Sequence, residues 1–361
     1  GQTTRYQYDP NGNLTSIVNA NGVTSASYTY DTFNRVATFT DSEGWQVSYS
    51  YDNADRVTRV TYPDGTYKRF TYDKLDLVSY SDRIGRVWRY TYDANRRRTS
   101  IVDPGGQQTL LNYDPSGRLV SRTDPKGNVT SWDYDVQGRL TTKTYADTSK
   151  VTYTYENTTS RVKSITDALG QTKQFNYAKD NAVTAITYTG AVNPTPNVSF
   201  SYDAYWPRIV SMSDGTGTNQ YSYVPVGTYG ALQRQQESTP FASGTISYAY
   251  DALGRLSNRT VAGAGPETFQ YDALGRPVTH ASDLGSFTLG YLGQTRQIAS
   301  RQLAGASLGT TWSYLPNSGD RRLSGVNTTG LSSGQYTTFQ YTSNDEDMTT
   351  GTTQTSDATI S

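Results

Sequence analysis

The chain has 361 residues with 32 basic and 32 acidic side chains, so its formal net charge at pH 7 is zero. A neutral chain lacks the positive field that nonspecific binding to nucleic acid requires. It contains no cysteine and one histidine, His280, which excludes a disulfide framework and a metal site built from several thiolates or imidazoles. No apolar run approaches the roughly 18 to 20 residues of a membrane span, so we expect no membrane span and no nucleic-acid partner.

Aromatic residues dominate the apolar part of the sequence. Hydrophobic residues make up only 34% of the chain, but 31 of its residues are tyrosines and 5 are tryptophans. Because these rings bury a large area each, we expect the packing to be aromatic and not aliphatic.

One seven-residue pattern recurs from the beginning of the sequence to its end. Its clearest copies are YDPSGRL, YDVQGRL, YDALGRL and YDALGRP. We count 16 tyrosine anchors, mostly 20 to 22 residues apart, which predicts an array of about 16 units of about 21 residues over residues 1–348. Residues 349–361 are predicted to be a polar, loosely ordered tail. The anchors are Tyr8, Tyr30, Tyr51, Tyr72, Tyr92, Tyr113, Tyr134, Tyr155, Tyr177, Tyr202, Tyr223, Tyr250, Tyr271, Tyr291, Tyr314 and Tyr341.

Each unit is predicted to begin with a β-strand that ends at its anchor. The residue two places before the anchor is aromatic in 14 units and leucine in 2, as in the pairs Trp132 and Tyr134 or Phe175 and Tyr177. A spacing of two places both side chains on one face of a strand. The abundance of Tyr, Thr and Val around these pairs favours strand over helix.

The residues after the anchor predict a tight turn. The aspartate can accept hydrogen bonds from amides two residues on, and Gly, Asn or Asp follows where a left-handed residue is needed. The arginine after that position is expected to align across units and to pair with turn aspartates as a structural ladder. The predicted repeat-defining residues are Tyr8, Asp9, Tyr30, Asp31, Tyr51, Asp52, Tyr113, Asp114, Gly117, Arg118, Tyr134, Asp135, Gly138, Arg139, Tyr250, Asp251, Gly254, Arg255, Tyr271, Asp272, Gly275 and Arg276.

A second turn completes each unit. A Leu, Val or Ile and alternating polar residues lead to another Asp-x-x-Gly stretch, as at 41–44 and 124–127. Strand, turn, strand, turn is a hairpin, so the sequence predicts an all-β antiparallel sheet of about 32 strands. A β-propeller is the alternative, but its four-stranded blades require a period of about 40 to 45 residues. The shorter period favours a continuous sheet wound as a spiral or solenoid shell.

This combination of motifs resembles the YD repeat of the Rhs family, which is shared by the C component of bacterial Tc toxins, wall-associated proteins and teneurins. The resemblance covers the chain from about Tyr6 to Met348. It implies a hollow, cocoon-like wall that encapsulates a C-terminal toxic domain until delivery, in secreted or cell-surface polymorphic toxins such as type VI secretion effectors. The implied partners are the toxin cargo and the remaining shell segments of the parent chain.

The sequence departs from a complete family member. The resemblance implies an aspartyl self-cleavage motif of the DPxGL type and a toxin domain, and we find neither. Asp103-Pro104-Gly105-Gly106 and Asp124-Pro125-Lys126-Gly127 fall in phase with the ordinary second turn, so we interpret them as turns.

We expect no enzymatic activity, no cofactor and no metal. His280 is the single histidine that a Ser-His-Asp triad could use, and we assign it to an ordinary strand position. Asp345-Glu346-Asp347 could bind Ca²⁺ through oxygens, although we favour a solvated turn. The alternative function is a cell-surface or wall-associated adhesin that binds glycans, because tyrosine and tryptophan ladders also stack against sugars.

Overall fold

The computed structural model describes residues 2–191, 193–242, 244–331, 335–346 and 348–356. Its elements are 32 β-strands and one three-residue 3-10 turn, η1 (Asn317–Gly319). Within these ranges no helix is long and apolar enough to cross a membrane. The chain divides into two compact units: unit 1 comprises Gly1–Arg89 and Glu267–Ser361, and unit 2 comprises Tyr90–Pro266.

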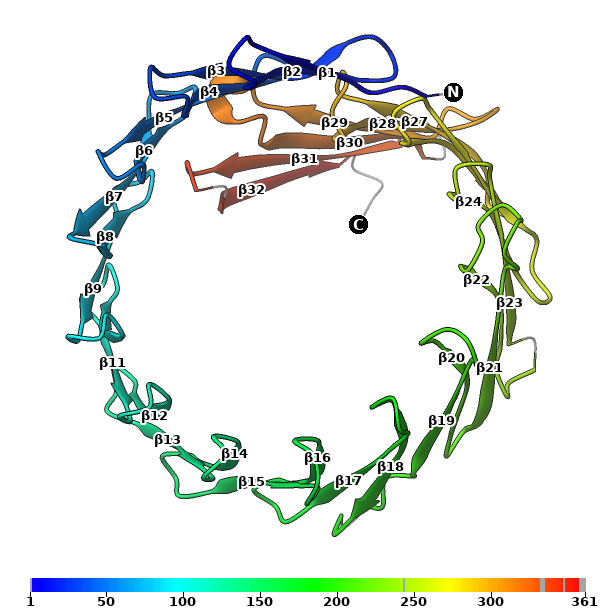
Figure 1. Ribbon diagram of the computed structural model, residues 1–361. Helices are drawn as coiled ribbons and strands as arrows, with labels where there is room; N and C mark the ends of the chain where they lie inside the picture. Colours follow the sequence, from blue (N-terminus) through cyan, green and yellow to red (C-terminus); the bar gives the residue numbers. More distant parts are fainter. Residues whose placement is uncertain (1, 192, 243, 332–334, 347, 357–361) are drawn as a thin grey trace. The chain divides into compact units, whose positions relative to one another are not determined.

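Unit 1 contains the strands from the two ends of the sequence (Figure 1). In each group, strands that follow one another in the chain pair antiparallel. The first group is β1 (Arg5–Tyr8), β2 (Leu14–Val18), β3 (Thr24–Tyr30), β4 (Val36–Asp41), β5 (Gln46–Tyr51), β6 (Val57–Thr61), β7 (Tyr67–Asp73), β8 (Asp76–Ser81) and the start of β9 (Val87–Tyr92). The second group is β25 (Glu267–Tyr271), β26 (Pro277–Ser282), β27 (Gly285–Tyr291), β28 (Ile298–Leu303), β29 (Gly309–Tyr314), β30 (Leu323–Leu331), β31 (Gln335–Ser343) and β32 (Thr349–Ser356).

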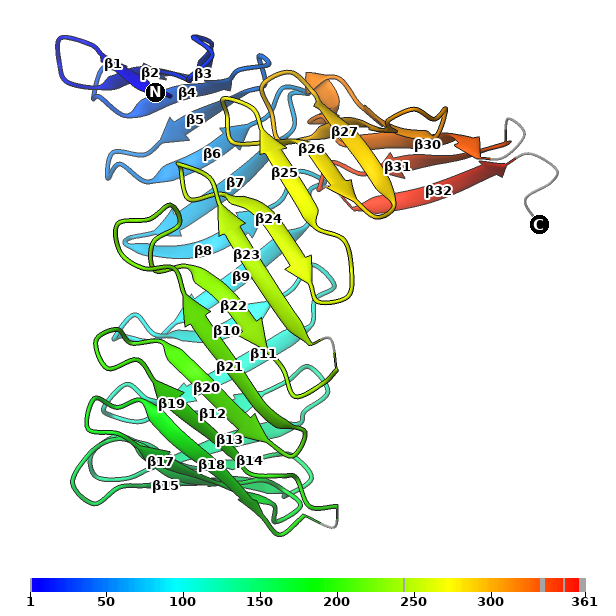
Figure 2. The ribbon, with the colours of Figure 1, turned by 90° about the vertical axis from the view of Figure 1, so that its right-hand side faces the viewer.

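Unit 2 is a single antiparallel strip in which every strand pairs with its sequence neighbours. Figure 2 shows β19 to β24 side by side in chain order. The strands are β10 (Arg98–Val102), β11 (Gln108–Tyr113), β12 (Leu119–Thr123), β13 (Val129–Tyr134), β14 (Leu140–Thr144), β15 (Lys150–Tyr155), β16 (Val162–Thr166), β17 (Thr172–Tyr177), β18 (Val183–Thr189), β19 (Val198–Tyr202), β20 (Ile209–Asp214), β21 (Gly217–Tyr223), β22 (Arg234–Ser238), β23 (Thr245–Tyr250) and β24 (Leu256–Val261).

A β-bulge interrupts the pairing at nearly every anchor tyrosine whose pairing is described. On β13, for example, Asp133 pairs with Thr142, but Tyr134 pairs with Leu140, so one residue of β14 is skipped. The same shift occurs at Tyr113, Tyr155 and the other anchors whose pairing is described, except Tyr341, where the shift lies between Thr342 and Ser343. Because a bulge bends a strand and increases its twist, the bulge that recurs at the anchor pairs curves the strip, as β11 to β23 show in Figure 1.

Few apolar side chains are fully buried in the part of the sheet that the structure describes. The buried apolar side chains there are Ala26, Val47 and Val224, and most of the paired strand rings, such as Tyr153 and Tyr155, are half-buried. The rings pack along the sheet: the centroids of Phe70 and Tyr80 lie 5.3 Å apart, and those of Tyr80 and Trp88 lie 5.4 Å apart. Packing is therefore aromatic and lateral, from one strand to the next.

The predicted all-β antiparallel YD-repeat sheet is confirmed. A propeller is not, because the pairing from β10 to β24 continues without a break into four-stranded blades. The predicted tail differs in its first part: Thr349–Ser356 forms β32 and pairs with β31, so it is ordered by the same ladder as the other strands. Residues 357–361 lie outside the described residues.

We expect the left-handed turn positions to tolerate asparagine better than alanine. Gly127 has φ of +85°, and no atom lies within 4 Å of the position that a Cβ would take, so the cost of substitution is backbone strain alone. Gly127→Ala should lower the free energy of unfolding by about 1 kcal/mol. Gly127→Asn should lose less, because Asn34 and Asn181 already adopt φ of 62° and 70°. Equal losses in thermal unfolding would contradict this account.

Candidate functional site

Each anchor turn is closed by its aspartate and arginine. In YDVQGRL the Oδ1 of Asp135 accepts hydrogen bonds from the backbone N–H groups of Gln137 and Arg139, both at 2.9 Å. The Oδ2 accepts from Nε of Arg139 at 2.7 Å, and Gly138 has φ of +82°. The backbone and side-chain hydrogen bonds from Arg139 hold the pKa of Asp135 below its ordinary value. The turn is therefore a charge-assisted ring that remains ionised at neutral pH.

The same ring recurs along the array. The Nε to Oδ2 distances are 2.8 Å for Asp31 and Arg35, 2.8 Å for Asp52 and Arg56, 2.6 Å for Asp114 and Arg118, 2.7 Å for Asp251 and Arg255, and 2.7 Å for Asp272 and Arg276. In the first unit, Asn13 takes the place of the arginine and donates to Asp9 at 2.9 Å. The glycines Gly117, Gly254 and Gly275 have positive φ, of 86°, 74° and 77°.

The anchor tyrosine binds the preceding unit. The hydroxyl of Tyr134 donates to the carbonyl of Leu119 at 2.9 Å, and that of Tyr155 donates to the carbonyl of Leu140 at 2.7 Å. The acceptor is in each case the first residue of the preceding return strand. Tyr30, Tyr51, Tyr113 and Tyr250 make the equivalent bond, whereas Tyr8 is 61% exposed.

The arginine of one turn binds the tyrosine of the next unit. The guanidinium of Arg139 lies 4.4 Å from the ring centroid of Tyr155, and that of Arg118 lies 4.9 Å from that of Tyr134. Each such cation–π contact stabilises by about 0.5–1 kcal/mol at exposed sites. One YD motif therefore closes its own turn through the Asp–Arg ring and joins neighbouring hairpins twice, through the Arg–Tyr stack and the Tyr hydroxyl. We call this set of contacts the inter-unit staple.

A buried charge cluster joins the two strand groups of unit 1. Its centre is Arg83, in the turn between β8 and β9, whose side chain is 3% exposed. The guanidinium pairs with Asp64 at 2.8 Å and with Asp320, and it stacks 3.9 Å from the ring centroid of Tyr62. Burial alone would lower the pKa of Arg83, but the hydrogen bonds and charges of Asp320 and Asp64 outweigh it and raise the pKa.

Asp320 brings the C-terminal strand group to this centre. Its carboxylate, 8% exposed, also accepts a hydrogen bond from Nε1 of Trp45 at 2.8 Å. Next to it, Arg321 pairs with Asp41. The turn between β4 and β5 and the segment around η1 are thus tied together, although more than 270 residues of sequence separate them.

The acidic stretch near the C-terminal end takes part in the same cluster. Glu346 accepts a hydrogen bond from the backbone N–H of Arg83 at 2.6 Å and pairs with Lys68 at 3.6 Å. Asp345 lies 3.4 Å from Arg322, and Asp347 lies outside the described residues. The interpretation as a solvated turn is wrong for Glu346, whose side chain is only 15% exposed. It is buried because it pairs with Lys68 of β7 and accepts the hydrogen bond from the backbone of Arg83.

His280 lies on β26, and its imidazole packs as an aromatic ring. It stacks on Phe269 with centroids 4.8 Å apart, and its Nε2 lies 3.7 Å from Glu267 without forming a hydrogen bond. In the described part of the chain, no group of three His, Asp or Glu side chains is arranged to hold a metal.

Sequence reasoning missed the charge cluster and half of the staple. Arg83 occupies a variable position of an Asp-x-x-Gly turn, where an exposed side chain is the normal expectation. The available signal was weak: Trp45 follows one such turn, and the stretch from Ser318 to Arg322 breaks the repeat pattern. The tyrosine hydroxyl bond and the arginine stack depend on how successive units pack, which a single motif does not reveal.

Comparison with known proteins agrees with this architecture. The family model described as Teneurin YD-shell matches residues 2–133 and 127–273. No curated protein sequence matches the chain.

Solved structures of Tc toxin components are similar in fold. The crystal structure of TcdB2-TccC3-TEV superposes with a TM-score of 0.50 at 15% identity, over 95% of this chain and 23% of that one. The crystal structure of TcdB2-TccC3 gives 0.50 at 14% identity, over 98% and 24%. The Photorhabdus luminescens Tc holotoxin pore gives 0.49 at 14% identity, over 94% and 22%. The chain thus spans about a quarter of the length of the structures it matches.

The tyrosine hydroxyl of the staple can be tested without changing the ring. Tyr155→Phe removes the bond to the Leu140 carbonyl and should lower the free energy of unfolding by about 1 kcal/mol. Tyr205→Phe is the matched control, because Tyr205 is 90% exposed and should be neutral. The measurement is denaturant unfolding of both variants, and equal stability of the two would refute the hydroxyl's role.

Removing the side chain of Arg83 should lower the free energy of unfolding more than Tyr155→Phe does. Arg83→Ala leaves the carboxylates of Asp64 and Asp320 buried without their cation, which we expect to lower the free energy of unfolding by about 3 kcal/mol. Arg5→Ala is the control, since Arg5 is exposed. Calorimetry should show the loss in the transition that includes unit 1, and a loss as small as that of the control would contradict burial of the cluster.

The staple predicts destabilisation by acid and by alkali. Its aspartates have pKa values below the ordinary value of about 3.9, so they stabilise the folded state above that pH and lose this contribution as the pH falls through the lowered values. Burial raises the pKa of Tyr155 and Tyr177, so stability should also fall as the pH rises above about 10. The unfolding temperature measured against pH checks both limits. Arg139→Gln should reduce the acid limb, and a flat profile below about pH 4 would contradict it.

Proposed function

Because the chain belongs to the teneurin YD-shell family, we propose that it is a non-catalytic wall segment of a secreted bacterial Rhs-type toxin, which encapsulates a C-terminal toxic domain and helps to deliver it. The partners would be that toxic cargo and the other wall segments of the parent toxin. Export by a type VI or a related secretion system is part of the proposal.

The supporting observation is a one-layer sheet with two chemically different faces. On β15, Tyr153 and Tyr155 are half-buried on one face, and Thr152 and Thr154 occupy the alternate positions. Among the described residues of unit 2, all strands belong to one strip, so no second layer of unit 2 covers the aromatic row. A large, half-exposed aromatic face is what we expect of a wall that contacts an enclosed cargo.

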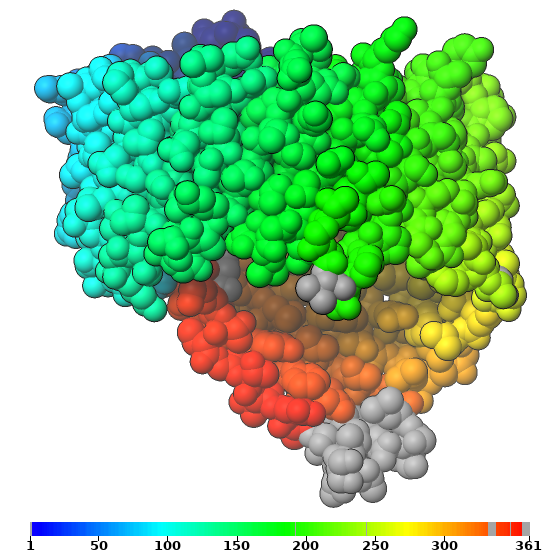
Figure 3. Space-filling model, turned by 90° about the horizontal axis from the view of Figure 1, so that it is seen from below, coloured from blue at the N-terminus to red at the C-terminus, as the bar shows by residue number. Residues whose placement is uncertain are grey.

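The chemistry of that face suits an unfolded or partly folded cargo. Tyrosine and tryptophan rings contact apolar groups with their bodies and hydrogen-bond polar groups with their tips, so they accept many sequences without selecting one. The inter-unit staple supplies the mechanical requirement, since it crosslinks successive hairpins side by side. Figure 3 shows the side chains of unit 2, cyan to green, packed against one another along the strip.

Protease protection tests encapsulation directly. The chain would be produced with the segments encoded on either side of it, and digestion of the C-terminal segment by a broad-specificity protease would be followed over time. We expect the segment to survive in the intact protein and to be digested at least tenfold faster after the wall is opened by Arg83→Ala. Arg5→Ala is the control and should leave protection intact.

Digestion of the segment at the same rate with and without the wall would refute encapsulation. Toxicity offers a second readout: cells that express the free C-terminal segment should die, whereas cells that express it behind the intact wall should grow.

A further inference from the structure

The face opposite the aromatic row is lined mostly by hydroxyl groups, but one part of it is strongly basic. The strand register places Ser50, Arg59, Arg69 and Ser81 in one row across β5, β6, β7 and β8. Arg89 on β9 pairs with Ser79 of β8 and so adds a third cation in the adjacent row, which also contains Thr71. All of these residues belong to unit 1.

Arg59 and Arg69 are direct cross-strand partners. Like charges directly opposite one another destabilise a sheet, so this arrangement is unfavourable unless an anion lies between them. Within the described residues, no carboxylate forms an ion pair with either side chain. The arginines of the neighbouring turns differ: Arg56 pairs with Asp52 at 2.6 Å, and Arg35 pairs with Asp31 at 2.7 Å.

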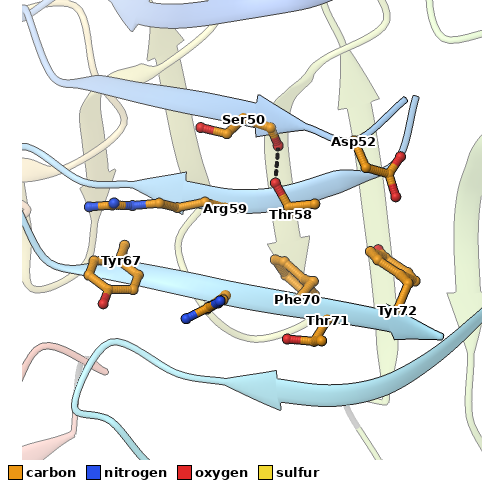
Figure 4. A pocket seen from close by; sticks show the side chains of 9 residues that line it. Ser50, Asp52, Thr58, Arg59, Tyr67, Phe70, Thr71 and Tyr72 are labelled. Carbon is orange, nitrogen blue, oxygen red and sulfur yellow. Dashed lines mark hydrogen bonds between the residues drawn. The ribbon is translucent and has the colours of Figure 1, made fainter. Parts of the chain in front are cut away.

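The two arginines line an open groove of about 470 Å³. Tyr67 forms one end and is 41% exposed, with the guanidinium of Arg59 3.8 Å from its ring centroid. Ser50 and Thr71 add hydroxyl groups to the lining, and Figure 4 shows Arg59 beside Tyr67 and away from Asp52. Asp52 at the edge of the groove is already bound by Arg56.

The groove is not covered by the other strand group of unit 1. Lys68 and Arg69 are neighbours on β7 and therefore project from opposite faces. Lys68 projects toward Glu346 of the turn between β31 and β32. The C-terminal group thus contacts the aromatic face, and the arginine pair lies on the face turned away from that contact.

We propose that this groove binds an anionic saccharide, a sugar that carries a sulfate or a carboxylate group. Adjacent strands are about 4.8 Å apart, which lets both guanidinium groups reach one anionic group, and the guanidinium fork matches the planar geometry of a carboxylate and the oxygens of a sulfate. Ser50 and Thr71 supply hydrogen-bonding partners for sugar hydroxyls, and the exposed ring of Tyr67 supplies a contact for the sugar ring. The site does not depend on the proposed wall function.

Saccharide chemistry is favoured over nucleic acid for two reasons. The chain is formally neutral, and this part of the face carries only three arginines, Arg59, Arg69 and Arg89, which are few for the binding of a polyphosphate backbone. The hydroxyl residues that flank the arginines match a ligand rich in hydroxyl groups.

Calorimetric titration of the full chain with defined oligosaccharides tests the proposal. The probes are a sulfated hexasaccharide, an oligogalacturonate of similar length, a neutral hexasaccharide and a single-stranded 20-nucleotide DNA. We expect both acidic sugars to bind more tightly than the neutral one, with an affinity that falls as salt rises. Arg59→Gln and Arg69→Gln should each weaken binding about tenfold.

The control carries the same loss of charge elsewhere. Arg5→Gln combined with Arg296→Gln removes two exposed arginines of unit 1 and should bind the acidic sugars as the unchanged chain does. The Arg59→Gln and Arg69→Gln variants should keep the unfolding temperature or raise it slightly, because they relieve a like-charge pair. Equal losses in the control, equal binding of the neutral sugar, or tighter binding of the DNA would each overturn the proposal.

Discussion

The rest of the structure depends on the hydrogen bonds that anchor tyrosines from Tyr30 to Tyr314 donate to a carbonyl of the preceding repeat. A β-sheet ladder connects strands through the backbone, but it does not set the angle between successive hairpins. The tyrosine hydroxyl lies 2.6 to 3.2 Å from its acceptor in these repeats, and it adds a side-chain link between two adjacent strands. The arginine stacked on the same ring fixes that ring in place.

This arrangement explains how the sheet is stable although few of its described side chains are fully buried. Most globular domains bury an apolar layer, whereas here few side chains are buried and each hairpin contacts mainly its neighbours. Stability then accumulates unit by unit, as in other repeat proteins. The exception is unit 1, where Arg83, Asp320 and Trp45 join strand groups from opposite ends of the sequence. Paired charges demand a matched geometry there, and an apolar contact would allow other registers.

Much of the fold could be predicted from the sequence because its causes are local. The alternation of Tyr153 and Tyr155, the turn-closing Asp135 and the left-handed Gly138 each act within a few residues. The bulge at the anchor was not predicted, because spacing alone does not show that one residue of the partner strand is skipped. The stack of Arg139 on Tyr155 was missed for a related reason, since it depends on the angle between two hairpins.

The sequence by itself determined the period, the hairpin unit and the antiparallel sheet, because backbone turns and strand alternation are encoded in neighbouring residues. Only the tertiary structure decided which charged residues meet. Arg83 lies in a turn like many others, and it becomes the buried centre of a cluster because Asp320 arrives from far along the chain. Arg59 and Arg69 are ordinary strand residues until the register of β6 and β7 sets them face to face. Contacts of this kind arise from register and from chain return, which no short motif contains.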